Sequence, residues 1–142
     1  MKRIRLLILL SVLAVALPVG VLSGVAKATS STGATSQLSI DQNSQYDVDG
    51  FIIHVGLRAR CPASLLFGTI EVTVTQSPPE SPTPAVGTSL VKDVVCDGQT
   101  HTVGASIHGE GFDEGRAWAK AEFLSGGSAK AERWINIIVM PG

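Results

Sequence analysis

The sequence predicts an all-β protein, an antiparallel β-sandwich of six to seven strands with one disulfide. Apolar and polar residues alternate with period two over several runs, which is typical of half-buried strands. Clusters of Gly, Pro and Asp separate these runs, as short strands joined by turns require. The chain has only two cysteines, so it can close at most one disulfide within itself.

Residues 1–28 have the pattern of a signal peptide. Three basic residues at positions 2, 3 and 5 precede the apolar run 6–17, and Ala26 and Ala28 supply the small residues of a cleavage site. We therefore expect cleavage after Ala28 and secretion of the remaining chain. An uncleaved membrane anchor is the alternative, because the uncharged stretch continues to Ala26 and about 20 apolar residues can span a bilayer.

The chain after the expected cleavage site is acidic. Four of the eleven Lys and Arg lie in residues 1–28, which leaves seven against twelve Asp and Glu, a net charge of −5. With no basic cluster to offset it, we expect no nucleic-acid binding and no membrane binding after signal cleavage. Residues 29–36 are small and polar and are expected to be a disordered leader, and 37–142 form the β-sandwich domain.

Two segments are the clearest predicted strands. Phe51 to Cys61 places an apolar residue at every second position, and Phe67 to Gln76 alternates β-branched apolar residues with Glu and Thr. A weaker strand is expected at Gln37 to Ile40. The sequence Asp47-Val48-Asp49-Gly50 is expected to be a turn, since it begins like a calcium loop but lacks the later carboxylate ligands.

The second half of the chain continues the pattern. Residues 77–84 contain four prolines and are expected to be an exposed connection. Further strands are predicted at residues 90–96, 100–108, 115–124 and 133–140. Residues 115–124 are also rich in good helix formers, so a helix is the alternative there, but their strict alternation favours a strand.

This arrangement of short strands favours a sandwich of immunoglobulin-like type. It differs from antibody domains, because Cys96 precedes the last three predicted strands and no Trp lies between Cys61 and Cys96. We therefore expect the Cys61–Cys96 disulfide to tie two strand ends together at one end of the sandwich. Closing a loop of this length contributes about 3–4 kcal/mol to the free energy of unfolding.

Several features combine along the chain: a signal peptide, a strand ending in Cys61, the motif Cys96-Asp97-Gly98-x-x-His101, and the run Phe112-x-x-Gly115-x-Ala117-x-Ala119-x-Ala121. This pattern resembles small secreted β-sandwich domains of unknown function from actinobacteria. The resemblance covers most of the chain after residue 28 and implies an immunoglobulin-like fold rather than an activity. The chain is also similar in size, acidity and sandwich class to the secreted apoproteins that hold enediyne chromophores, which have two disulfides.

Few residues suggest catalysis or metal binding, and we expect no catalytic, metal or cofactor site. The chain has three histidines, His54, His101 and His108. His101 and His108 are seven residues apart on one predicted strand, so their side chains project to opposite faces and cannot share a metal.

Trp118 and Trp134 are the candidate recognition residues. Alternation puts Trp118 on the same face as Arg116, Lys120 and Glu122. If this face is exposed, the tryptophans form a possible recognition patch. The interpretation favoured by their size is instead that both belong to the core, because buried aromatic side chains dominate small cores.

Together these features predict a secreted, non-enzymatic domain that recognises an extracellular protein or glycan without a cofactor. A carrier or sequestering protein for a small ligand is the alternative, and it requires an apolar pocket between the sheets. A hydrolase is a third and less favoured hypothesis. It requires a His within hydrogen-bond reach of both a Ser and a carboxylate.

Overall fold

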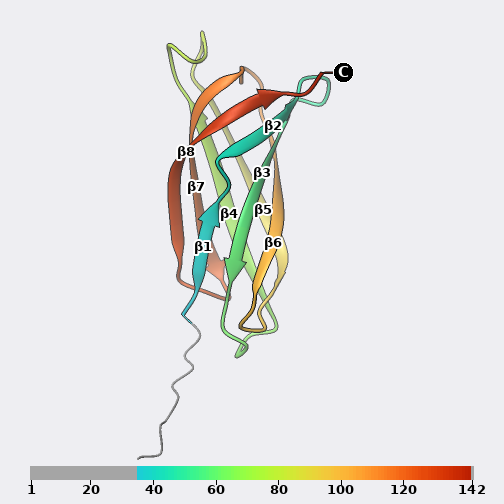
Figure 1. Ribbon diagram of the computed structural model, residues 1–142, viewed down its shortest axis with the longest axis vertical. Coiled ribbons are helices and arrows are strands. Elements are labelled where there is room, and N and C mark those ends of the chain that lie inside the picture. The colour runs from blue at the N-terminus through green and yellow to red at the C-terminus, as the bar shows by residue number, and fades with distance from the viewer. Residues whose placement is uncertain (1–34, 142) are drawn as a thin grey trace, which may run out of the picture.

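Eight strands and no helix make up the described part of the chain, residues 35–141 of the computed structural model (Figure 1). The strands are β1 (Gln37–Ile40), β2 (Asn43–Asp47), β3 (Ile52–Arg60), β4 (Phe67–Gln76), β5 (Ala85–Val95), β6 (Thr100–His108), β7 (Gly115–Ser125) and β8 (Lys130–Val139). The predicted all-β class is confirmed. The segment 115–124, for which a helix was the alternative, is a strand.

The predicted signal peptide, residues 1–28, and most of the predicted leader, 29–36, lie outside the described residues. Ser36, at the end of that leader, accepts a hydrogen bond at Oγ from the backbone N–H of Ser128 at 3.2 Å. Within residues 35–141, no helix has the length and apolar character needed to cross a membrane.

The strands form one sheet in the order β1-β3-β2-β8-β7-β4-β5, with β6 on the other edge of β3. All pairs are antiparallel except β2 with β8, which is parallel. The sheet curls, so that β3 lies in front of β4 in Figure 1. β5 and β6, at the two ends of the sheet, approach each other so closely that a Cβ at Gly87 would lie 2.5 Å from Cγ2 of Ile107.

β1 and β2 are two halves of one interrupted strand along β3. β1 pairs with the C-terminal half of β3 and β2 with the N-terminal half. Residues 41–44 lie opposite only Val55 and Gly56, so the chain bulges there. The predicted six or seven strands omitted β2, because Asn-Ser-Gln-Tyr-Asp has little β-propensity of its own and is held by neighbours on both edges.

The core lies inside the curl and is built from the inward positions of the alternating strands. β3 and β4 contribute large aliphatic side chains, and β7 contributes three alanines. Each buried aliphatic side chain of the size of Val, Leu or Ile stabilises the fold by roughly 1.5–3 kcal/mol. Fully buried members are Ile53, Leu57, Ala59, Ile70, Val72, Val74, Ile107, Ala117, Ala119, Ala121 and Ile135.

The connections gather at the two ends of the elongated molecule (Figure 1). We call one the disulfide end; it consists of the connections 61–66, 96–99 and 126–129, and β1 begins there. We call the other the far end; it consists of the connections 48–51, 77–84 and 109–114, and β8 ends there. The predicted proline-rich connection is thus at the far end, between β4 and β5.

Candidate functional site

Trp118 and Trp134 are direct cross-strand partners on the outer face of the sheet. Ala117 and Ala119, on either side of Trp118, are fully buried, so the alternation of β7 turns Trp118 outward. Trp134 is 52% exposed. The interpretation that both tryptophans belong to the core is therefore wrong, because small alanines occupy the inward face of β7.

The two indole rings and Arg116 form one cluster. The ring centroids lie 5.3 Å apart at an interplanar angle of 69°, which is an edge-to-face pair. Such pairs contribute about 0.5–1.5 kcal/mol beyond the area they bury. The guanidinium carbon of Arg116 lies 4.8 Å from the ring centroid of Trp134, a cation–π contact. The free protein therefore already holds these side chains in a defined arrangement.

Gln76 holds the backbone of Arg116 in place. Its buried side chain donates from Nε2 to the carbonyl oxygens of Asp113 at 3.0 Å and Arg116 at 3.3 Å. Its Oε1 accepts a hydrogen bond from the backbone N–H of Asp113 at 2.9 Å. Gln76 was not identified from the sequence as part of the site. The sequence does contain a clue to it: Gln76 is a polar residue at an inward position of β4, where the alternation otherwise places apolar residues.

The tryptophans belong to a row that crosses four strands. Trp134, Trp118, Thr75 and Val86 are successive register partners on β8, β7, β4 and β5. Val86 is exposed, and so is Leu90 on the same face of β5. We call this outer face the tryptophan face. Val86 was missed from the sequence because the predicted strand began only at Leu90.

Charged side chains border the tryptophan face. Lys130 Nζ lies 2.7 Å from Oε1 of Glu122, and Lys120 Nζ lies 3.8 Å from Oε2 of the same carboxylate. The hydrogen bond from Lys130 holds the pKa of Glu122 below its ordinary value, and the charges of Lys130 and Lys120 add to this effect. Glu122 is therefore ionised at neutral pH.

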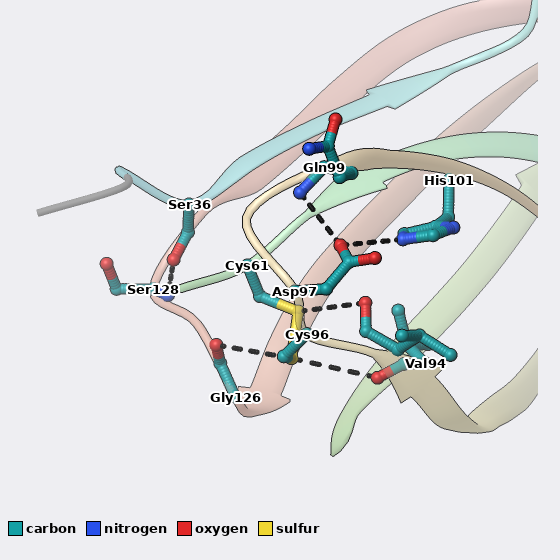
Figure 2. Close-up of a disulfide and its surroundings, with 10 residues drawn as sticks. Ser36, Cys61, Val94, Cys96, Asp97, Gln99, His101, Gly126 and Ser128 are labelled. Carbon is teal, nitrogen blue, oxygen red and sulfur yellow. Dashed lines mark hydrogen bonds and ion pairs between the residues drawn. A yellow bond between two sulfur atoms is a disulfide. The ribbon is translucent and has the colours of Figure 1, made fainter. Parts of the chain in front are cut away.

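Cys61 and Cys96 form the predicted disulfide, which joins the residue after β3 to the residue after β5 (Figure 2). Both cysteines are buried, and the bond lies at one end of the molecule, as expected. Gly126 packs against it: a Cβ there would lie 3.1 Å from Sγ of Cys96 and 2.5 Å from Cα of Gly68. The φ of Gly126 is also +81°, a conformation that favours glycine.

Asp97 organises the turn after the disulfide. Its Oδ1 accepts hydrogen bonds from the backbone N–H of Gln99 at 2.8 Å and from Nε2 of His101 at 2.8 Å (Figure 2). These two hydrogen bonds, the one from His101 first, lower the pKa of the Asp97 carboxyl. The arrangement explains the Cys96-Asp97-Gly98-x-x-His101 motif as a turn that leads from the disulfide into β6.

The three histidines do not come together. Alternation along β6 separates His101 and His108 on opposite faces, as expected. Nδ1 of His54 lies 3.3 Å from Oγ of Ser106. Among the hydrogen bonds of the described residues, none joins His54 to a carboxylate, and no group of three metal-ligating side chains occurs in that part of the chain. The Asp47 carboxylate instead accepts from the backbone N–H groups of Asp49 and Gly50, which confirms the predicted turn.

Four depressions of about 390 to 630 Å³ open on the described residues, and neither tryptophan lines any of them. The largest of these four is lined in part by Gly56 and Gly104, cross-strand partners on β3 and β6. His54, Ile138 and Met140 border it. It opens on the outer side of β3, whereas a carrier was expected to hold its ligand between two layers of strands.

Comparison of the chain with models of known protein families finds no match, and neither does comparison with curated proteins.

Proposed function

We propose that the chain is a secreted, non-enzymatic recognition domain of immunoglobulin-like type that binds an extracellular protein through the tryptophan face. Secretion rests on the signal pattern of residues 1–28. The immunoglobulin-like type is supported by the strand neighbours: β1 and β6 flank β3, and β7 lies between β8 and β4. β5 departs from the constant-domain pattern, because it pairs with β4.

The observation that carries the binding proposal is the cluster of the exposed Trp134 and Arg116 with the half-buried Trp118. Trp and Arg are the residue types most enriched among side chains that dominate protein–protein affinity. Because their mutual contacts already order these side chains, little conformational entropy is lost on binding. Val86 and Leu90 extend the apolar area, and the surrounding lysines and glutamates form a polar rim.

An extracellular glycan is the second candidate partner. Thr75 lies between Trp118 and Val86, and the hydroxyls of Thr73 and Thr88 lie 3.1 Å apart in the adjacent row. Hydroxyl groups beside an aromatic ring match the mixed apolar and hydrogen-bonding surface of a sugar. A protein is preferred, because Arg116 and exposed aliphatic side chains accompany the rings.

The test uses the exported protein and a partner captured from culture medium, identified and then purified. We expect Trp118→Ala and Trp134→Ala each to weaken the affinity by about thirtyfold or more, as loss of a dominant contact does. Phe51→Ala, an exposed aromatic residue at the far end, is the matched control and should leave the affinity unchanged. Equal affinities for all four proteins would contradict the proposal.

Glycan arrays with the same variants distinguish the second candidate. Binding to a polysaccharide that both tryptophan substitutions abolish, with no protein partner captured, would assign the tryptophan face to glycan recognition. Circular dichroism of each variant establishes that the fold is retained.

A further inference from the structure

The disulfide end carries a second exposed apolar surface, remote from the tryptophan face. Three consecutive residues in the β3–β4 connection and at the start of β4 are exposed: Leu65 at 50%, Leu66 at 80% and Phe67 at 57%. Val95, the register partner of Phe67, is exposed too. We call Leu65, Leu66 and Phe67 the apolar tip. Consecutive large apolar side chains of this kind on a surface mark an interaction site.

The backbone of the apolar tip is hydrogen-bonded to the connection that carries Cys96. The carbonyl oxygen of Leu66 accepts a hydrogen bond from the backbone N–H of Cys96 at 3.1 Å. The N–H of Gly98 donates to the carbonyl of Cys61 at 3.0 Å, and the Cys61–Cys96 disulfide lies between these contacts. The loop backbone therefore already presents these side chains outward. Binding through them costs little conformational entropy of the chain.

The acidic residues of the connections are concentrated at the far end. The connections at the far end, 48–51, 77–84 and 109–114, contain five acidic residues and no Lys or Arg. The connections at the disulfide end contain a single charged residue, Asp97, whose carboxylate accepts a hydrogen bond from His101. The disulfide end is thus the only end of the described domain that approaches an anionic surface without strong repulsion.

A depression of about 510 Å³ at the disulfide end is lined in part by Arg58, Arg60 and Lys130. Lys130 is paired with Glu122, and Nε of Arg58 lies 4.0 Å from Oδ1 of Asp41. Nε of Arg60 is buried, and no atom of residues 35–141 accepts a hydrogen bond from it. Arginine is the side chain best suited to phosphate, because its planar donors match two phosphate oxygens. A phosphate group in this depression would meet the guanidinium groups of Arg58 and Arg60 that line it.

The chain that precedes the described residues joins the fold at this same end. Ser36 lies against Ser128 beside the disulfide (Figure 2). Residues 1–34 therefore continue from the disulfide end, and they include the apolar run 6–17.

We propose that the disulfide end docks on an anionic phospholipid bilayer, with Leu65, Leu66 and Phe67 entering its interface and Arg58 and Arg60 facing lipid phosphates. This differs from the expectation based on a net charge of −5. Net charge averages over the molecule, whereas docking depends on the end that meets the surface. The site is separate from the tryptophan face, so the domain can hold the bilayer and a partner at once.

Insertion is tested with the exported protein, whose N-terminus is determined by mass spectrometry, and vesicles of phosphatidylcholine and phosphatidylglycerol. In a Trp118→Phe, Trp134→Phe background, Leu66→Trp reports from the apolar tip and Phe51→Trp from the far end. We expect brominated lipids to quench the fluorescence of the Leu66→Trp protein and not of the Phe51→Trp protein. No quenching in the Leu66→Trp protein, or equal quenching in both, would overturn the proposal.

Affinity for the same vesicles gives an independent measurement. Removing one exposed leucine by Leu66→Ser should weaken vesicle binding about tenfold, and Val48→Ser, an exposed apolar residue at the far end, should not change it. Arg60→Gln should weaken binding about fivefold, and only when phosphatidylglycerol is present. Because every variant carries the same N-terminus, these differences report on the domain itself.

Two other binding partners of the apolar tip can be distinguished from a bilayer by experiment. A concentration-dependent dimer in analytical ultracentrifugation that Leu66→Ser dissociates, with no vesicle binding, would assign the tip to a second copy of the chain. Tight binding of a soluble protein that needs Leu66, again without vesicle binding, would assign it to a protein groove. Either outcome would overturn lipid docking while leaving the proposed function of the tryptophan face intact.

Discussion

Tyr46, the only tyrosine of the chain, is buried in β2 between two neighbouring strands. Burial raises the pKa of its hydroxyl above the ordinary value, and the carboxylates of Asp113, Asp47 and Glu110 add to this effect by disfavouring a second negative charge. Folding therefore favours the neutral phenol.

The Tyr46 hydroxyl should titrate at a higher pH in the folded protein than in the unfolded one. Its stabilising contribution is fully present below the unfolded pKa of about 10 and is lost as pH rises through the folded pKa. The tyrosinate absorbance, followed against pH with and without denaturant, measures both midpoints, since no other tyrosine contributes. Coincident midpoints would contradict the prediction.

Gln76→Leu should lower the free energy of unfolding by about 1–3 kcal/mol, because it leaves the backbone N–H of Asp113 and two carbonyl oxygens without partners. Denaturant unfolding measures the change. The same substitution at the exposed Gln45 is the matched control and should alter stability by less than about 0.5 kcal/mol. A similar loss in both variants would show that the hydrogen bonds of Gln76 are not the cause.

At the scale of elements, the approach of β5 to β6 brings the two ends of the curled sheet together. Glycine allows it: at Gly87, a Cβ would lie 2.5 Å from Ile107 and 3.0 Å from the carbonyl oxygen of His108. At Gly104, in the middle of β6, no atom lies within 4 Å of such a Cβ. The two glycines thus differ in the space around them, although both lie in strands.

Gly87→Ala should destabilise the protein by about 1–3 kcal/mol, because the added methyl group must displace β6 or its side chains. Gly104→Ala should leave stability unchanged or raise it by up to about 1 kcal/mol, since alanine restricts the unfolded chain without a clash. Thermal and denaturant unfolding of both variants compare the two sites. An equal loss at both would point to strand propensity instead of the β5–β6 contact.

At the scale of the whole molecule, the disulfide connects the two arms of the curl, since it joins the end of β3 to the end of β5. Closing this loop removes conformations from the unfolded chain. It also fixes the connections that present the apolar tip, so stability and the proposed docking depend on the same bond.

Cys61→Ala with Cys96→Ala should lower the free energy of unfolding by about 3–4 kcal/mol. Denaturant unfolding of the exported protein and of the double variant measures the loss, and mass spectrometry after thiol labelling establishes that the exported protein has no free thiol. Labelled cysteines in the exported protein, or equal stability of the two proteins, would contradict a structural role for the bond.

Most strands and turns could be predicted because they depend on local chemistry. Alternation marked β3, β4, β6 and β7, and β-branched residues marked β8. Asp47 and Gly50 marked a turn, and the cysteines marked the disulfide. β2 and the start of β5 could not be predicted in the same way, because their pairing partners, rather than their own residues, hold them as strands.

The sequence by itself determined the all-β class, the strand periods and the disulfide, since these follow from residue types and their spacing. Only the tertiary structure decided which face of β7 is buried, because alternation defines two faces without saying which one the sheet curls around. It also decided that Val86 joins the row of Trp118 and Trp134, and that acidic and apolar connections lie at opposite ends. These relations join residues far apart in the chain, and strand pairing alone brings them together.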